Sequence, residues 1–443
     1  RRESIHPVHR RHHVTFGQLP GDFSVAVPVI FDQAYARKML QPIVNDGSAN
    51  IFNYNTLQRQ LLLIRDFGAT KFNTTLAKGS QLGGSRLIVD LDNNYLSGMI
   101  GLNNFVSDQM GDFQTSGYGQ FITPTSQPLK IGVGGSYSYP FSDYGLWTGY
   151  SSLSSPIGNQ GFKADALWST SSTTTKDLFS GSGKIQSIGS SNFWQFGISY
   201  PIVLERNSKL SIALLGTGQN SYSDLYLDDK LVTNLSTDKI RTAQLAVEGY
   251  FASLRSVNTI NFRLSQGIGG LDSDLESDQY LSNPLSSSTF TKARLDLSRS
   301  QKVFDFGTQL TVKGSGQLSS TSLPSAEAFT YGGPLYGKAF RSVYTLGDQG
   351  WATAVEVAQK INFTIYNKPV EFTPYAWYDY GNTQYKAGLL SDQTVSTYGF
   401  GLRGDALNIN YELWWGIPSS NSLNSDFIGI SNSAIGFNTF WRF

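Results

Sequence analysis

From about Tyr95 to the C-terminus, apolar and polar residues alternate in runs of about 6 to 15 residues. Clusters of Gly, Ser, Asn, Asp and Pro separate the runs, and helical periodicity is lost. Because successive side chains of a strand point to opposite faces, each run predicts a strand with one apolar and one polar face. The runs number about sixteen, an even number within the range of single-chain membrane barrels.

The segments between the runs differ in length in a way that suits a barrel. Some joins are tight, such as Asn367–Pro369, whereas polar segments at Ser171–Ser191, Gly270–Ser288 and Ser319–Gly347 are long. Short turns on one rim and long loops on the other are typical of membrane barrels. Six tryptophans near the predicted strand ends would form interfacial girdles: Trp147, Trp168, Trp194, Trp351, Trp377 and Trp441.

The composition agrees with a barrel in a membrane. Charged residues make up only 15% of the chain, while hydrophobic residues reach an ordinary 40%. No stretch approaches the ~18 consecutive apolar residues of a membrane-spanning helix. A membrane protein without such a stretch must close its sheet, because lipid offers no partner to exposed backbone groups. A secreted β-solenoid or adhesin would show the same composition.

Several classes of function are disfavoured. The chain has no cysteine, which excludes disulfides and thiol chemistry, and its net charge of +1 gives no case for nucleic acid. All four histidines lie in residues 1–14, which we interpret as a flexible basic leader rather than a metal site. The leader lacks the apolar core of a signal peptide, so an exported chain would be a mature or trimmed one. We expect no enzyme activity, catalytic residue, metal or cofactor.

Residues 15–93 differ from the rest and predict a small α+β module, followed by the barrel at 94–443. The segment Phe31–Pro42 is predicted to be helical, and Asn55–Asp66 has apolar residues at helical spacing behind a potential N-cap. Short alternating runs follow at Thr70–Leu76 and Arg86–Leu91.

Two segments resemble known outer-membrane proteins. The terminal run Ala434–Phe443 resembles the closing strand, with its C-terminal Phe443, by which the insertion machinery recognises outer-membrane barrels. Leu57–Gly68 and the following Thr75–Gly79 and Gly83–Asp90 resemble the end of the periplasmic POTRA domain of two-partner secretion (TpsB) transporters. Phe67 stands here where that family usually has Pro. Those transporters normally carry two POTRA domains and often a plug helix, and only one POTRA length is present here.

A longer segment, Glu327–Gly350, resembles the motif of the TpsB loop that folds into the barrel lumen. Its matching positions are Gly332 and Gly333, Gly337, Asp348 and Gly350. At the tip, Lys338 stands in place of the usual Arg and Ala339 in place of Gly, followed by Phe340. Downstream, Trp377, Asp379 and Gly381 match a motif on a later barrel strand.

The resemblance implies that the tip of this loop meets Asp379 on the inner wall. Lys offers one point charge where Arg would offer a planar fork, so we expect a weaker or differently placed contact. Arg341 would partly substitute for it, and Glu356 is a second candidate wall carboxylate. The alternative is that Asp379 simply lines a solvated pore.

The resemblance further implies an outer-membrane translocase. It would bind an unfolded TpsA-type exoprotein in the periplasm and secrete it through the lumen, with the loop at about 319–347 as gate or plug. Expected partners are that exoprotein, outer-membrane lipid and lipopolysaccharide, and the barrel insertion machinery, with the chain itself a monomer. The alternatives are a barrel-assembly or lipid-handling relative, a passive diffusion porin, and an outer-membrane enzyme.

Overall fold

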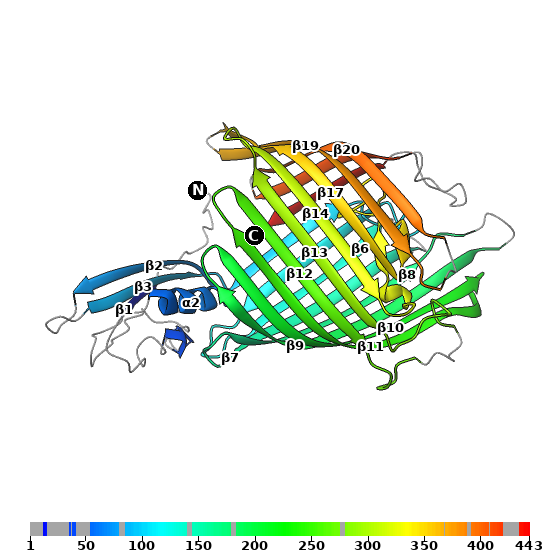
Figure 1. Ribbon diagram of the computed structural model, residues 1–443, viewed down its shortest axis with the longest axis horizontal. Helices are drawn as coiled ribbons and strands as arrows, with labels where there is room; N and C mark the ends of the chain where they lie inside the picture. The colour runs from blue at the N-terminus through cyan, green and yellow to red at the C-terminus, as the bar shows by residue number, and fades with distance from the viewer. Residues whose placement is uncertain are drawn as a thin grey trace, which may run out of the picture.

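A computed structural model describes twelve segments of the chain (Figure 1), namely residues 12–15, 35–36, 38–40, 54–78, 85–139, 144–178, 183–274, 280–366, 368–387, 391–406, 408–419 and 434–443. Sixteen antiparallel strands in these segments close into one barrel, as the alternating runs predict. The strands, in chain order, are β4 (Leu96–Asn103), β5 (Phe113–Ile122), β6 (Lys130–Tyr139), β7 (Gly145–Ile157), β8 (Phe162–Thr174), β9 (Ile185–Leu204), β10 (Ser208–Leu227), β11 (Lys230–Ala252), β12 (Ser256–Gly267), β13 (Thr291–Lys302), β14 (Thr308–Ser319), β17 (Gln349–Gln359) continued by β18 (Ile361–Ile365), β19 (Lys368–Gln384), β20 (Gln393–Ala406), β21 (Ile409–Pro418) and β22 (Ala434–Arg442).

Each strand pairs with its neighbour in the sequence, and β22 pairs with β4 to close the barrel. This closing seam has five residue pairs, from Asn438–Asn103 to Arg442–Met99, the fewest between any two neighbouring strands of the wall as described. At its end, Phe443 exchanges two backbone hydrogen bonds with Gly98, at N···O distances of 3.0 and 3.1 Å. The seam is therefore the wall's shortest ladder.

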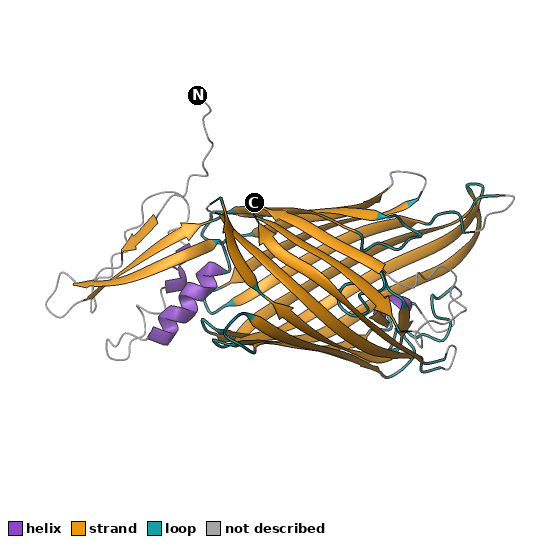
Figure 2. Ribbon diagram, turned by 90° about the horizontal axis from the view of Figure 1, so that it is seen from above, coloured by secondary structure: helices purple, strands orange, loops and turns teal. Residues whose placement is uncertain are grey.

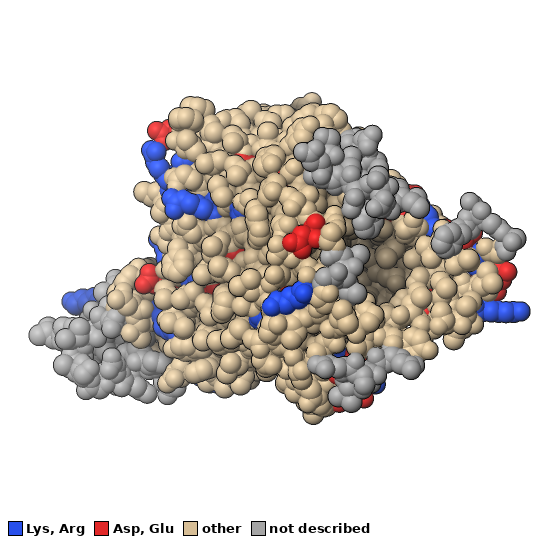
Figure 3. Space-filling model, turned by 45° about the vertical axis from the view of Figure 1, so that its right-hand side comes forward, with Lys and Arg blue, Asp and Glu red and all other residues tan. Residues whose placement is uncertain are grey.

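The two faces of the wall differ as a membrane barrel requires. Large apolar side chains are exposed on the outer face, among them Leu214 at 67% and Phe196 at 62%. Inward-pointing polar side chains such as Thr383 and Asp379 are buried. On the face shown in Figure 3, charged side chains are few among the described residues of the barrel wall. No helix within the described ranges is long and apolar enough to cross a membrane.

Several strands are longer than predicted. The segment Ser171–Ser191, predicted as a loop, is mostly strand, because β8 runs to Thr174 and β9 begins at Ile185. The strands β10 and β11 form a hairpin of 20 and 23 residues that turns at Asp228 and Asp229, both at positive φ. The girdle prediction is wrong for Trp377, which points inward and is buried.

At one end of the barrel lies a small module with a three-stranded sheet in the order β1–β3–β2 and one long helix (Figures 1 and 2). Its elements are β1 (His12–Thr15), α2 (Tyr54–Arg65), β2 (Ala69–Lys78) and β3 (Ser85–Asn93). The helix predicted at Asn55–Asp66 is confirmed. Because His12–Thr15 pair with β3, the predicted flexible leader does not extend over residues 12–14. Its first eleven residues lie outside the described segments.

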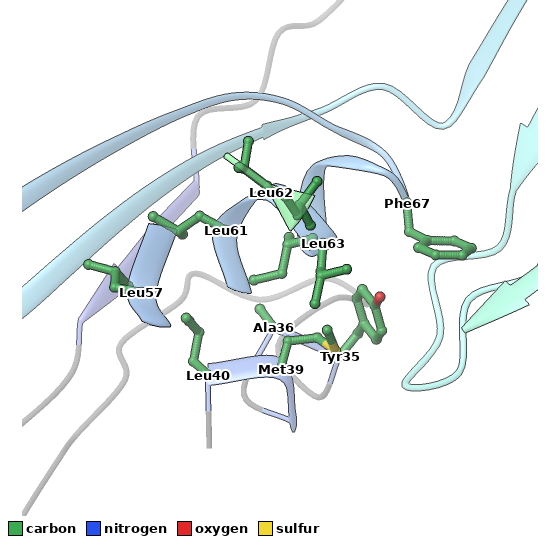
Figure 4. Close-up of a cluster of buried hydrophobic side chains, with 11 residues drawn as sticks. Tyr35, Ala36, Met39, Leu40, Leu57, Leu61, Leu62, Leu63 and Phe67 are labelled. Atoms are coloured by element: carbon green, nitrogen blue, oxygen red, sulfur yellow. The ribbon is translucent and has the colours of Figure 1, made fainter. Parts of the chain in front are cut away.

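Apolar residues at helical spacing on α2 form the core of this module (Figure 4). Leu57, Leu61 and Ile64 pack there with Tyr35 and Met39 of the preceding helical residues. The rest of the helix predicted at Phe31–Pro42 falls outside the described segments. Leu204, at the end of β9, joins the same cluster, so the core continues onto the rim of the barrel.

Candidate functional site

The connection between β14 and β17 is a folded unit on the inner face of the wall. It contains the 3-10 turn η1 (Ser325–Glu327) and a hairpin of β15 (Phe329–Tyr331) with β16 (Thr345–Gly347), which contacts β17 and β19. Figure 2 shows η1 near the end of the barrel away from α2. Phe340 stacks on Tyr344 with ring centroids 4.1 Å apart and belongs to a buried cluster with Phe329 and Tyr331. We call residues 319–347 the lumen loop.

The glycines of the loop motif occupy backbone conformations that other residues rarely adopt. Gly332, Gly333 and Gly337 have φ of 123°, 95° and 79°. A Cβ on Gly332 would lie 2.4 Å from the backbone N of Tyr344, and one on Gly337 would lie 2.7 Å from the Tyr331 ring. These positions need glycine both for backbone freedom and for space.

Asp379 on β19 receives the tip of the lumen loop. Its carboxylate accepts hydrogen bonds from the Tyr331 hydroxyl at 2.5 Å and the Thr397 hydroxyl at 2.5 Å. The backbone N–H groups of Gly337 and Lys338 donate to it at 3.0 and 3.5 Å. Burial, together with the adjacent Asp379 carboxylate, raises the pKa of Tyr331, so its hydroxyl stays protonated as a donor.

Gly381 and Gly350 leave room for this packing. A Cβ on Gly381 would lie 2.4 Å from the Tyr331 ring, and one on Gly350 would lie 2.6 Å from the Phe329 ring. Both glycines belong to barrel strands, so the strand motif and the loop motif fit one another sterically.

The Lys338 side chain does not bind Asp379, and its contact is placed instead on Glu356, the second candidate wall carboxylate, and on Glu412. The Lys338 ammonium lies 3.6 Å from Glu356 Oε2 and 3.6 Å from Glu412 Oε1. The rings of Tyr375, Trp377 and Trp414 surround it, at 4.8, 5.2 and 5.9 Å from their centroids. The carboxylate of Asp379 already accepts hydrogen bonds from the tyrosine and threonine hydroxyls, and the lysine side chain extends past it along the wall. We call the five residues around the ammonium the lysine cage, namely the two glutamates and the three aromatic residues.

Two further bonds complete the cage. Arg403 on β20 binds Glu356 at 2.6 Å, so that carboxylate faces two cations. The indole N–H of Trp414 donates to the Lys338 carbonyl at 3.0 Å. Because a buried charge is costly unless it is paired, this arrangement holds the loop tip at one depth.

Arg341 does not reach Asp379 either. It binds Asp108, in the loop after β4, at 2.8 Å and links the lumen loop to the segment next to the seam. The buried carboxylate of Asp348 accepts from the backbone N–H of Leu323 at 2.7 Å and of Lys386 at 2.8 Å. It therefore joins the start of the lumen loop to the β19–β20 connection.

At the C-terminus, the Phe443 side chain is half exposed on the outer face of the seam. Its ring centroid lies 5.2 Å from that of Trp441, and a Cβ on Gly98 would lie 2.4 Å from the ring.

Sequence reasoning missed several residues of this site: Asp108, Tyr331, Thr397, Arg403, Glu412 and Trp414. The sequence does contain one signal for the aromatic part of the site. Tyr375, Trp377 and Asp379 follow one another at intervals of two residues, so a strand places all three on one face. No comparable signal marks Glu412, whose role depends on how two strands of the wall are placed beside the loop tip.

The sequence and the fold were compared with those of known proteins. Residues 83–404 match the family described as haemolysin secretion/activation protein ShlB/FhaC/HecB, which is well over half of the chain. The chain belongs to this family. It is thus a two-partner secretion transporter, whose outer-membrane barrel serves the secretion of a partner protein. No curated protein matches the sequence.

Solved structures show that the fold of this transporter recurs. CdiB from Escherichia coli superposes with a TM-score of 0.76 at 19% identity, over 92% of this chain and 74% of that protein. CdiB from Acinetobacter baumannii superposes with a TM-score of 0.68 at 16% identity, over 98% of this chain and 78% of that protein. BamA from Haemophilus ducreyi lacking POTRA domains 1–3 superposes with a TM-score of 0.55 at 10% identity, over 98% of this chain and 90% of that protein.

Proposed function

We propose that this transporter binds an unfolded TpsA-type exoprotein in the periplasm and passes it through the barrel lumen, with the lumen loop as its gate. The observation that supports this most directly is the asymmetry of the lumen. The loop is bound to the wall formed by β17 and β19–β21, whereas the opposite side contains a cavity of about 1050 Å³ lined by β6 to β14. Leu335 and Tyr336 of the loop form the border of this cavity.

The cavity lining suits an extended polypeptide. Serine, asparagine and charged side chains, including Ser152, Ser199, Ser211 and Asn261, line the cavity together with apolar ones such as Leu215. Such groups can hydrogen-bond a passing backbone without holding one sequence. The N-terminal module, which we assign as a periplasmic POTRA domain spanning residues 15–93, has a sheet edge that can add a strand of substrate.

The membrane-related parts of the proposal follow from the wall. Its apolar outer face fits outer-membrane lipid and lipopolysaccharide, and the exposed aromatic pair Trp441 and Phe443 supports recognition by the barrel insertion machinery. The continuous wall closes within one chain, in agreement with a monomer.

Gene deletion and complementation test this function. We expect loss of one secreted partner from the culture medium on deletion, and its return when the wild-type gene is supplied. If every secreted β-solenoid protein is unaffected by the deletion, the proposal is wrong. Loss of other outer-membrane barrels would support the barrel-assembly alternative, and a large, steady, ion-selective conductance of the purified chain would support a porin.

A further inference from the structure

Three lysines stand at the α2 end of the lumen. Lys130 is the first residue of β6, Lys163 the second of β8 and Lys209 the second of β10, so all three lie where their strands leave the rim that carries the N-terminal module. Their side chains line the lumen cavity. We call them the lysine cluster.

A residue of the N-terminal module already occupies this cluster. Asp66, directly after α2, forms an ion pair with Lys209 at 3.3 Å. Its neighbour Phe67 lies under Lys130, whose ammonium is 5.5 Å from the ring centroid. The carboxylate of Asp66 is thus an intramolecular occupant of the site, which shows that a carboxylate fits there.

The lysine cluster contains more positive than negative charges. Its second carboxylate is Asp165, which accepts a hydrogen bond from Ser199 at 3.0 Å. Three cations therefore face two carboxylates, because Glu248, a further carboxylate that lines the same cavity, is paired with Arg263 at 3.8 Å. In the described part of the chain, neither Lys130 nor Lys163 forms an ion pair within 4.0 Å.

The other contacts between module and rim lack this electrostatic character. Arg59 donates to the Pro201 carbonyl at 2.7 Å and stacks over the Tyr200 ring, and Lys38 binds the Gln127 side chain at 3.0 Å. In both contacts the module supplies the cation and the barrel a neutral acceptor, whereas at Lys209 the module supplies the carboxylate and the barrel the cation. Asp66 is the contact that an anionic ligand in the lumen can replace.

We propose that the lysine cluster is a receiving site for an acidic segment of the translocating exoprotein, which displaces Asp66 and so loosens the module from the barrel mouth. This rests on the proposed function, because it requires a polypeptide to enter from the α2 side. A carboxylate-bearing chain fits better than a lipid headgroup, since the cluster faces the lumen and not the apolar outer wall. It exchanges one ion pair for another and needs no external energy.

Peptide block of single channels tests the site. The full chain is inserted into planar bilayers, and a glutamate-rich peptide or a glutamine-rich peptide of the same length is added on the α2 side. We expect the glutamate peptide to block at lower concentration, and Lys163→Gln or Lys209→Gln to weaken that block about two- to fivefold, as for a partly exposed ion pair. Lys163→Arg should retain it.

Asp66→Asn separates the displacement from simple binding. It removes the internal competitor, so the glutamate peptide should block more strongly than in the wild type. Lys230→Gln, at the far tip of the β10–β11 hairpin, is the charge-matched control and should leave the block unchanged. Heat-modifiable migration in gels confirms that each barrel is folded.

Three outcomes overturn the inference. The first is equal block by the two peptides. The second is a block by the glutamate peptide that does not change when Lys130, Lys163 and Lys209 are all replaced by Gln. The third is an Asp66→Asn variant that the glutamate peptide blocks no more strongly than the wild type. If secretion by complemented cells is intact in any of these cases, only this inference fails. If the wild-type gene secretes no partner, the proposed function fails instead.

Discussion

At the residue scale, the replacement of the family's usual Arg by Lys338 is explained by what surrounds it. An arginine fork suits one carboxylate bound by two parallel hydrogen bonds. Here the ammonium lies at equal distance from Glu356 and Glu412, with three aromatic rings supplying the rest of its environment. A compact charge fits between two carboxylates, and the rings favour a cation further.

Replacing Lys338 tests this interpretation. Lys338→Met removes the cation but keeps most of the volume, and leaves Glu412 without its ion partner in the cage. Breaking a buried pair in this way costs about 3–5 kcal/mol. We expect secretion to fall sharply, while Lys338→Arg keeps part of it. Immunoblots of the secreted partner measure the secretion of both variants. Equal secretion by Lys338→Met and the wild type would contradict the view that the lysine cage is needed for secretion.

Asp379→Asn removes a charge without changing shape. The amide has one acceptor oxygen for four donors and places its own NH₂ group among them. Each charge-assisted hydrogen bond that is lost costs about 1.5–3 kcal/mol. We expect the loop tip to detach, with larger and noisier single-channel conductance in a barrel that still folds. Thr394→Ala, on the outer face of β20, is a control that should leave conductance as it is.

At the element scale, strand alternation predicted the barrel well but not the lengths of all its strands. Strands that face lipid on one side and water on the other alternate clearly, and these were found. The outer parts of β10 and β11 are rich in Ser, Asn and Asp, so their two faces differ little and the pattern fades. The resemblance likewise indicated the lumen loop and Asp379, but the partner of Lys338 depends on side-chain depth, which a motif does not encode.

The seam between β22 and β4 is extended by a side chain. The buried amide of Asn104 donates to the Ile435 carbonyl at 2.8 Å and accepts from the Phe437 N–H at 2.9 Å. The next residue, Phe105, packs against Trp414 with centroids 5.4 Å apart, and Trp414 binds the loop tip. The seam and the lumen loop therefore share one set of contacts.

Asn104→Ala should weaken the closing strand pair. Two hydrogen bonds are lost, each worth about 1 kcal/mol, in a seam that has few others. We expect the temperature of heat-modifiable unfolding to fall measurably. Asn258→Ala removes two solvent-exposed hydrogen bonds from the β12 wall, one to the Phe251 carbonyl and one from Arg299, and should shift that temperature less. An equal shift in both variants would show that the seam is not a weak point.

At the scale of the whole molecule, the barrel holds a fixed wall on one side of its lumen and an open cavity on the other. The lumen loop borders that cavity, and Arg341 ties its tip region to the loop beside the seam. A passing polypeptide must either fit beside the loop or move it. Which of the two happens decides whether the loop is a gate or a fixed constriction.

A reversible cross-link distinguishes these cases. The hydroxyls of Thr345 on β16 and Thr383 on β19 are 2.9 Å apart, so Cys at both positions can form a disulfide between loop and wall. The chain has no other cysteine, so the bond is unique. Because we propose that the loop moves, we expect oxidation to stop secretion and a reductant to restore it. Each single Cys variant is the matched control and should secrete under both conditions. Full secretion by a quantitatively oxidised double variant would mean that the polypeptide passes through the open cavity while the hairpin stays on the wall.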